Sequence, residues 1–118
     1  TFRLDGNGRD LDERACRRLG HLLGQNTNLA ILRIEHVNLM DFLGLCEGLQ
    51  NNRCIRFLGF NGINLQDPGN MSISAPILSH HPSLKTIYLT RCNLTSAGID
   101  ILSDALANRS HQDTIQRL

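Results

Sequence analysis

One eleven-residue pattern occurs three times in the chain and limits the possible folds more than any other feature. The segments are LAILRIEHVNL, IRFLGFNGINL and LKTIYLTRCNL, which start at Leu29, Ile55 and Leu84, 26 and then 29 residues apart. In each, leucine, isoleucine or phenylalanine fills the first, fourth, sixth and eleventh places, and asparagine the tenth. These intervals of three, two and five fit neither a helix nor a lone strand. Self-similarity at a period of about 20–50 residues is typical of a repeat architecture.

Each segment contains a short predicted strand. Side chains at the fourth and sixth places point to one side of it, and those at the third, fifth and seventh to the other. The pattern therefore predicts strands near residues 32–34, 58–60 and 87–89. A helix between successive strands would make the strands parallel, with right-handed crossovers. Since one such unit cannot bury its apolar face alone, neighbouring units are expected to stack.

Three stretches between the strands carry helical patterns. The segment DLDERACRRLGHLLG is expected to start at a capping box of Asp10 and Glu13. The last helix is expected to be capped by Thr95 or Ser96. Pro76 predicts a brief or irregular helix in the unit that begins at Ile55, because proline lacks an amide donor. The predicted buried helical residues are Ala15, Leu19, Leu22, Leu23, Phe42, Leu45, Leu49, Ile99, Leu102 and Leu106.

The three segments, each followed by a stretch that can form a helix, resemble leucine-rich repeats of the longer, ribonuclease-inhibitor-like class. The resemblance covers almost the whole chain. It implies an α/β fold, a right-handed solenoid or horseshoe of about four repeats with parallel strands on its concave side and helices on its convex side. The expected repeats are 1–28, 29–54, 55–83 and 84–114, with the start of a further repeat at 115–118. Neither end carries a polar capping unit, so a fragment of a longer solenoid is expected.

Charge and cysteine content indicate the partners and the cellular compartment expected for the protein. Twelve basic and eleven acidic residues give a net charge of +1, which provides no bulk attraction to nucleic acid or to an anionic membrane. No apolar run approaches the roughly 18 residues of a membrane-spanning helix. The four cysteines form no CxxC pair, and Cys92 occupies a core position. Reduced cysteines favour an intracellular, cytoplasmic protein. A Cys46–Cys54 disulfide and secretion stay open, the latter through sequons at Asn70, Asn93 and Asn108.

No catalytic, cofactor or metal site is predicted. His80, His81 and His111 lie in turn sequences and are interpreted as solvated, because their spacing does not fit a zinc site. The glycine-rich DGNGRD lacks the Gly-Lys-Ser/Thr of a phosphate loop and is expected to be a strand-to-helix turn. No nucleophile motif with histidine and acid partners is present. The protein is therefore not expected to be an enzyme.

The outward strand positions form the candidate site. The predicted protein-binding residues are Ile31, Arg33, Glu35, Phe57, Asn61, Thr86, Tyr88 and Thr90, with Gly59 on the same face and Arg3, Asp5 and Arg117 added by the partial repeats. Tyrosine and arginine are favoured in interface hot spots. The resemblance implies a protein–protein interaction module with a protein partner of unknown identity. A regulator of a GTPase or other enzyme, and a structural subunit of a larger assembly, are the alternatives, and fold alone does not choose among them.

Overall fold

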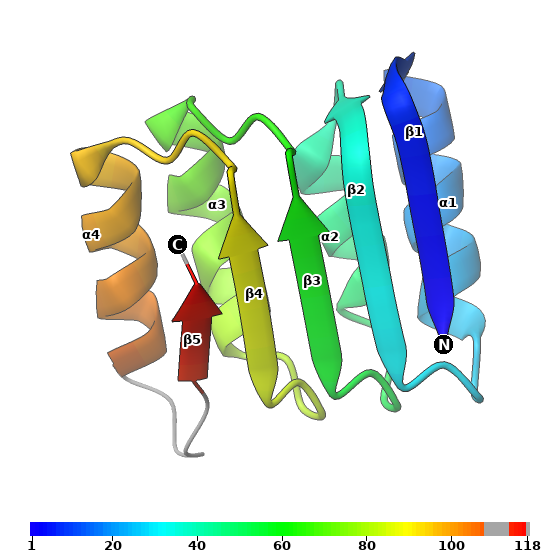
Figure 1. Ribbon diagram of the computed structural model, residues 1–118. Coiled ribbons are helices and arrows are strands. Elements are labelled where there is room, and N and C mark those ends of the chain that lie inside the picture. Colours follow the sequence, from blue (N-terminus) through cyan, green and yellow to red (C-terminus); the bar gives the residue numbers. More distant parts are fainter. Residues whose placement is uncertain (108–113, 118) are drawn as a thin grey trace.

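Strands and helices alternate along the chain. The computed structural model describes the backbone of residues 1–107 and 114–117 and the side chains of residues 1–67 and 71–107. The strands are β1 (Phe2–Leu11), β2 (Ile31–Leu39), β3 (Phe57–Asn61), β4 (Thr86–Thr90) and β5 (Thr114–Arg117). The helices are α1 (Glu13–Gln25), α2 (Phe42–Leu49), α3 (Pro68–Ser79) and α4 (Ser96–Ala107). The strands form one sheet in chain order, the helices cover one of its faces, and the other face is open (Figure 1).

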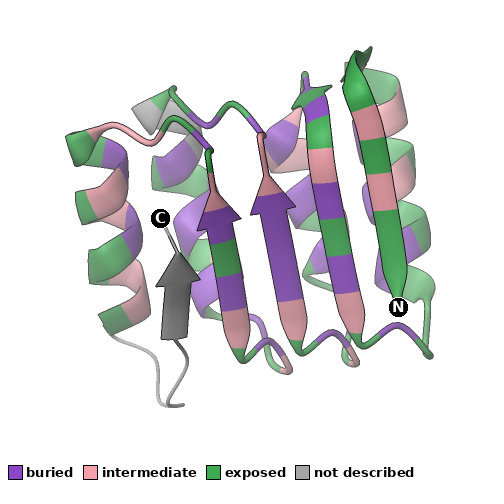
Figure 2. Ribbon diagram, viewed as in Figure 1, coloured by how far each residue is buried: buried purple, intermediate pink, exposed green. Residues whose placement is uncertain are grey.

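The predicted strands and their parallel pairing are confirmed. Each neighbouring pair of strands is parallel, and the sixth places of the three segments stand side by side: Ile34 pairs with Phe60, and Phe60 with Leu89. These three side chains point toward the helices and are almost completely buried. Burial alternates along β4 and along β2 on either side of Glu35 and His36, as the two-residue strand period requires (Figure 2).

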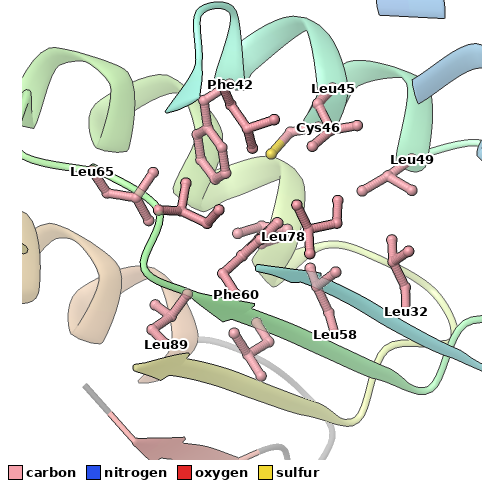
Figure 3. Close-up of a cluster of buried hydrophobic side chains, with 14 of the residues drawn as sticks. Leu32, Phe42, Leu45, Cys46, Leu49, Leu58, Phe60, Leu65, Leu78 and Leu89 are labelled. Carbon is pink, nitrogen blue, oxygen red and sulfur yellow. The ribbon is translucent and has the colours of Figure 1, made fainter. Parts of the chain in front are cut away.

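A single hydrophobic core lies between the sheet and the helices. Side chains from β2, β3 and β4 meet those of α2 and α3, including the predicted Phe42, Leu45 and Leu49 (Figure 3). The ring of Phe42 packs edge-on against Phe60, with centroids 5.4 Å apart and an interplanar angle of 69°. Cys92 is buried in this core, as predicted.

The buried stripe of α1 differs from the prediction. Leu23 is buried, but Ala15 and Leu19 are only half-buried and Leu22 is 55% exposed. The other buried residues of α1 are Cys16, Gly20 and Gly24. Here the backbone of α1 touches that of α2, because a Cβ built on Gly20 would lie only 2.7 Å from the Leu45 carbonyl oxygen. Glycines therefore form the centre of this helix contact, and the apolar pattern alone does not indicate it.

The helix boundaries correct two further expectations. Asp12, not Asp10, caps α1: its Oδ1 accepts a 2.8 Å hydrogen bond from the Ala15 amide, whereas Asp10 still belongs to β1. Thr95 caps α4, as predicted, through a 3.0 Å bond from the Gly98 amide. The helix with Pro76 is not brief, since α3 has 12 residues. Pro76 lies near its C-terminal end, where a missing amide donor affects only the last turn.

Buried polar side chains connect successive helix-to-strand turns. Asn52 donates to the carbonyls of Leu23 (2.8 Å) and Asn26 (2.9 Å) and accepts from the Ile55 amide (2.8 Å). One repeat later, His81 Nε2 lies 3.0 Å from the Leu49 carbonyl oxygen. The expectation of a solvated His81 is therefore wrong: its side chain is needed to satisfy backbone groups inside the turn. His80 is exposed, and His111 lies outside the described residues.

The DGNGRD segment lies within β1 rather than in a strand-to-helix turn. Pairing with β2 is interrupted between Asp5 and Arg9, which forms a bulge containing Asn7 (φ 51°) and Gly8 (φ 80°). The corresponding left-handed residues are His36 within β2, Gly62 directly after β3 and Arg91 directly after β4. The first strand thus accommodates extra residues at a point where each of the first four repeats has a left-handed residue.

Candidate functional site

The candidate site is the open face of the sheet, meaning the side chains of β1 to β4 that point away from the helices. The parallel register places outward positions of neighbouring strands in rows: Arg33 with Gly59 and Tyr88, and Glu35 with Asn61 and Thr90. Ile31, Phe57 and Thr86 form a third row. All eight predicted residues therefore lie on this face. Arg3 and Asp5 extend the rows onto β1, whereas the side chain of Arg117 lies outside the described residues.

An aromatic cluster occupies the centre of the open face. The rings of Phe57 and Tyr88 are nearly perpendicular, at 81°, with centroids 4.9 Å apart. The guanidinium carbon of Arg33 lies 5.4 Å from the Phe57 ring centroid, which is a cation–π distance. Tyr88 is 37% exposed, so part of this residue remains accessible to a partner. The structure thus brings together three of the eight predicted protein-binding residues.

Gly59 makes this cluster possible. It lies between Arg33 and Tyr88 in the sheet, and a Cβ at this position would lie 3.1 Å from Cε1 of Phe57. The Phe57 ring therefore leans over the glycine and buries it. Sequence reasoning placed Gly59 on the open face but not in the site. The sequence signal was a glycine at the outward position that aligns with Arg33 and Tyr88 of the neighbouring segments.

A shallow hollow of about 130 Å³ lies beside the cluster. Its lining residues are Arg33, Glu35, Phe57, Gly59, Phe60, Asn61, Tyr88 and Thr90. Pockets for drug-sized ligands typically enclose about 300–1,000 Å³, so this hollow matches a protruding side chain better than a whole small molecule. Ile31 and Thr86 lie on the same face but do not line it.

The acidic residues of the open face already have partners. Glu35 accepts hydrogen bonds from Arg3 Nε and from Asn61 Nδ2 (3.3 Å). The bond from Arg3, more than any other contact, holds the pKa of Glu35 below its usual value. The pKa of Asp5 is also lowered, first by a 3.1 Å bond from the Asn7 amide and further by His36, whose Nδ1 lies 3.4 Å away. Both carboxylates are thus ionised and compensated within the protein.

Within the described residues, the potential metal ligands form no cluster and the thiols form no disulfide. Across the described residues, no three histidine, cysteine, aspartate or glutamate side chains lie close enough together to hold a metal ion. All four cysteines are free thiols, so the Cys46–Cys54 disulfide does not form. Burial raises the pKa of Cys16, Cys46 and Cys92, which keeps these thiols protonated and unreactive.

The hydrophobicity of the helices and the sequons relate to membranes and glycosylation. None of the helices within the described residues is long and apolar enough to cross a membrane. Of the three sequon asparagines, Asn93 is exposed, and the side chains of Asn70 and Asn108 lie outside the described residues.

Comparison with known proteins supports the repeat interpretation. No family model matches the chain. A mouse (Mus musculus) protein, "NACHT, LRR and PYD domains-containing protein 14", is 34% identical over 80 residues, which cover 66% of this chain. The chain spans only 8% of the length of that relative. The similarity points to repeats of the leucine-rich type, and the alternating parallel strands and helices agree with it.

Proposed function

We propose that the chain is a protein-interaction module whose concave sheet face binds a protein partner. The supporting observation is the cluster of Arg33, Phe57 and Tyr88 beside a shallow hollow on the open face, in which Arg33 and Tyr88 are exposed. Interface hot spots favour tyrosine and arginine, and they lie where a partner can exclude water around them. A sheet with a well-packed core beneath it holds these side chains in place before binding, which lowers the entropic cost of association.

The proposal includes the finer features of the fold. The repeats belong to the ribonuclease-inhibitor-like class and form a right-handed solenoid of about four units, with the boundaries given by the sequence pattern. Right-handed crossovers are the rule for parallel strands joined by helices. Stacking of such units creates the extended concave surfaces that repeat proteins use for binding.

The proposed module has no catalytic activity of its own and uses no cofactor or metal. Its partner is a protein rather than a nucleic acid or a membrane, because a net charge of +1 provides no general attraction to polyanions. We place the protein in the cytoplasm, since four unpaired thiols are stable in a reducing compartment.

The test compares a change on the sheet face with a change on the helical side. Arg17 is unsuitable for the control, because its Nε donates to Asp41 at 2.9 Å and thus connects α1 to α2. Arg18 is exposed on the same helix without such a contact and serves instead. Partners recovered from the native source with the unmodified protein are measured by calorimetry against both variants.

Tyr88→Ala is expected to weaken binding by about 1–2 kcal/mol, which is about 5- to 30-fold. Arg18→Ala should leave the affinity unchanged. Thermal melts should show both variants folded, because neither side chain belongs to the core. Loss of binding in Arg18→Ala but not in Tyr88→Ala would place the partner on the helical side and refute the proposal.

A further inference from the structure

Among the described side chains, three cations on or beside the open face have no acidic partner. Arg33 lies in β2, and Arg56 and Lys85 lie where β3 and β4 begin. All three are exposed, and no carboxylate among the described side chains is within ion-pair distance of any of them. Arg56 and Lys85 are neighbours, since the Lys85 amide donates to the Arg56 carbonyl at 2.8 Å.

The acidic side chains of the same face do not compensate this charge. Glu35 is bonded to Arg3, and Asp5 is in contact with Arg3 and His36. The carboxylates of the face, including Glu35 beside the hollow, are therefore paired, whereas Arg33, Arg56 and Lys85 have no carboxylate partner among the described side chains. This local difference is invisible in the net charge of the whole chain.

The geometry of Arg33 suits one kind of ligand. Its guanidinium lies over the Phe57 ring, which restricts its movement, and no carboxylate of the described residues pairs with its N–H groups. A planar guanidinium binds the two oxygens of a carboxylate through two parallel hydrogen bonds. The hollow begins beside this group, and the partly exposed ring of Tyr88 forms part of its lining.

We infer that the hollow recognises an acidic segment of a partner protein. An aspartate or glutamate carboxylate binds Arg33, and an apolar side chain next to it enters the hollow against Tyr88. Arg56 and Lys85 attract the acidic segment toward the strand starts and increase its association rate. This inference rests on the proposed function and specifies the chemistry of its partner.

A nucleic acid fits the same cations less well. Binding of single strands relies on aromatic faces that are open to stacked bases. Arg33 covers one face of Phe57, and Tyr88 stands edge-on to the same ring. The cluster therefore presents no pair of parallel open rings.

The experiment selects binders from a display library of random dodecapeptides on the immobilised protein. The enriched peptides are then synthesised, and their affinities are measured by fluorescence anisotropy for wild type, Arg33→Gln, Tyr88→Ala and the helix-face control Arg18→Gln. We expect enrichment of peptides with Asp or Glu beside an apolar residue. Arg33→Gln, or amidation of the peptide acid, should weaken binding at least about tenfold. Affinity should fall as NaCl rises from about 50 to 300 mM, and Arg18→Gln should have no effect.

The outcomes separate the inference from the proposed function. Binders that require Tyr88 but contain no acid and tolerate Arg33→Gln would refute the acidic partner and leave the concave face as a binding surface. Binders indifferent to both Arg33→Gln and Tyr88→Ala, or no enrichment at all, would count against both. Displacement of the peptide by a single-stranded oligouridylate would point to a nucleic acid and overturn the inference. Arg33→Lys keeps the charge without the fork, so it should bind more weakly than wild type.

Discussion

Gly48 is the residue where a single added methyl group has the clearest structural consequence. In the contact of α1 with α2, a Cβ built on Gly48 would lie 2.6 Å from Cα of Gly20 and 2.5 Å from its carbonyl oxygen. Both are backbone atoms, so no side-chain rotation relieves the overlap. Gly48→Ala therefore forces the two helices apart.

The expected free-energy change combines two opposing effects. Overpacking a well-packed contact costs about 1–3 kcal/mol, and a clash with backbone belongs at the upper end of that range. Alanine is favoured over glycine within a helix by about 1 kcal/mol. The strain is the larger effect, so Gly48→Ala should lower the free energy of unfolding by about 1–2 kcal/mol.

Gly98 in α4 offers a matched control. A Cβ there would lie 3.4 Å from Cδ2 of Leu94 and 3.5 Å from Oγ1 of Thr95, which are ordinary contacts. Gly98→Ala should therefore stabilise the protein by up to about 1 kcal/mol. Urea denaturation followed by far-ultraviolet circular dichroism measures both variants. If Gly48→Ala raised the midpoint as Gly98→Ala does, the close helix contact would be refuted.

Three further predictions concern the core, a buried turn and acid stability. Leu89→Ala should lower the free energy of unfolding by about 2–5 kcal/mol in urea denaturation, because Leu89 is only 1% exposed. Amide hydrogen exchange should also become faster in the neighbouring β3, and an unchanged denaturation midpoint would contradict the core position of Leu89. His81→Ala should lower the free energy of unfolding by about 1–3 kcal/mol in the same assay, because it leaves the Leu49 carbonyl unsatisfied. His81→Asn should lower it less, since Asn52 makes equivalent hydrogen bonds one repeat earlier, and equal losses would argue against the hydrogen-bonding role of His81. Burial raises the pKa of Asp41, but hydrogen bonds from Arg17 and the Gly44 amide outweigh burial and hold the pKa below its usual value of 3.8. The ionised carboxylate therefore stabilises the folded state above pH 3.8, and this stabilisation is lost as the pH falls through the pKa that Asp41 has in the folded state. Asp41→Asn should consequently reduce the difference in melting temperature between about pH 6 and about pH 2, and an undiminished difference would refute this linkage.

The positions and directions of the strands follow from the sequence alone. In each segment, the fourth and sixth side chains must leave water together, and a strand is the local structure that places them on one side. Ile34, Phe60 and Leu89 are therefore identifiable as core without any knowledge of their neighbours. The same alternation identifies Arg33, Phe57 and Tyr88 as outward-facing. The order of the sheet follows because each strand must stack on the next repeat.

Contacts between repeats were decided by the tertiary structure. The stacking of Arg33 on Phe57 and the edge-on contact of Phe57 with Tyr88 depend on the register of three strands, 24 to 31 residues apart in sequence, and on the absence of a side chain at Gly59. The burial of His81 depends on a carbonyl 32 residues earlier. Periodicity reports only whether a side chain faces the core or the solvent. Which group it meets there depends on distances between backbones that form only when the repeats pack together.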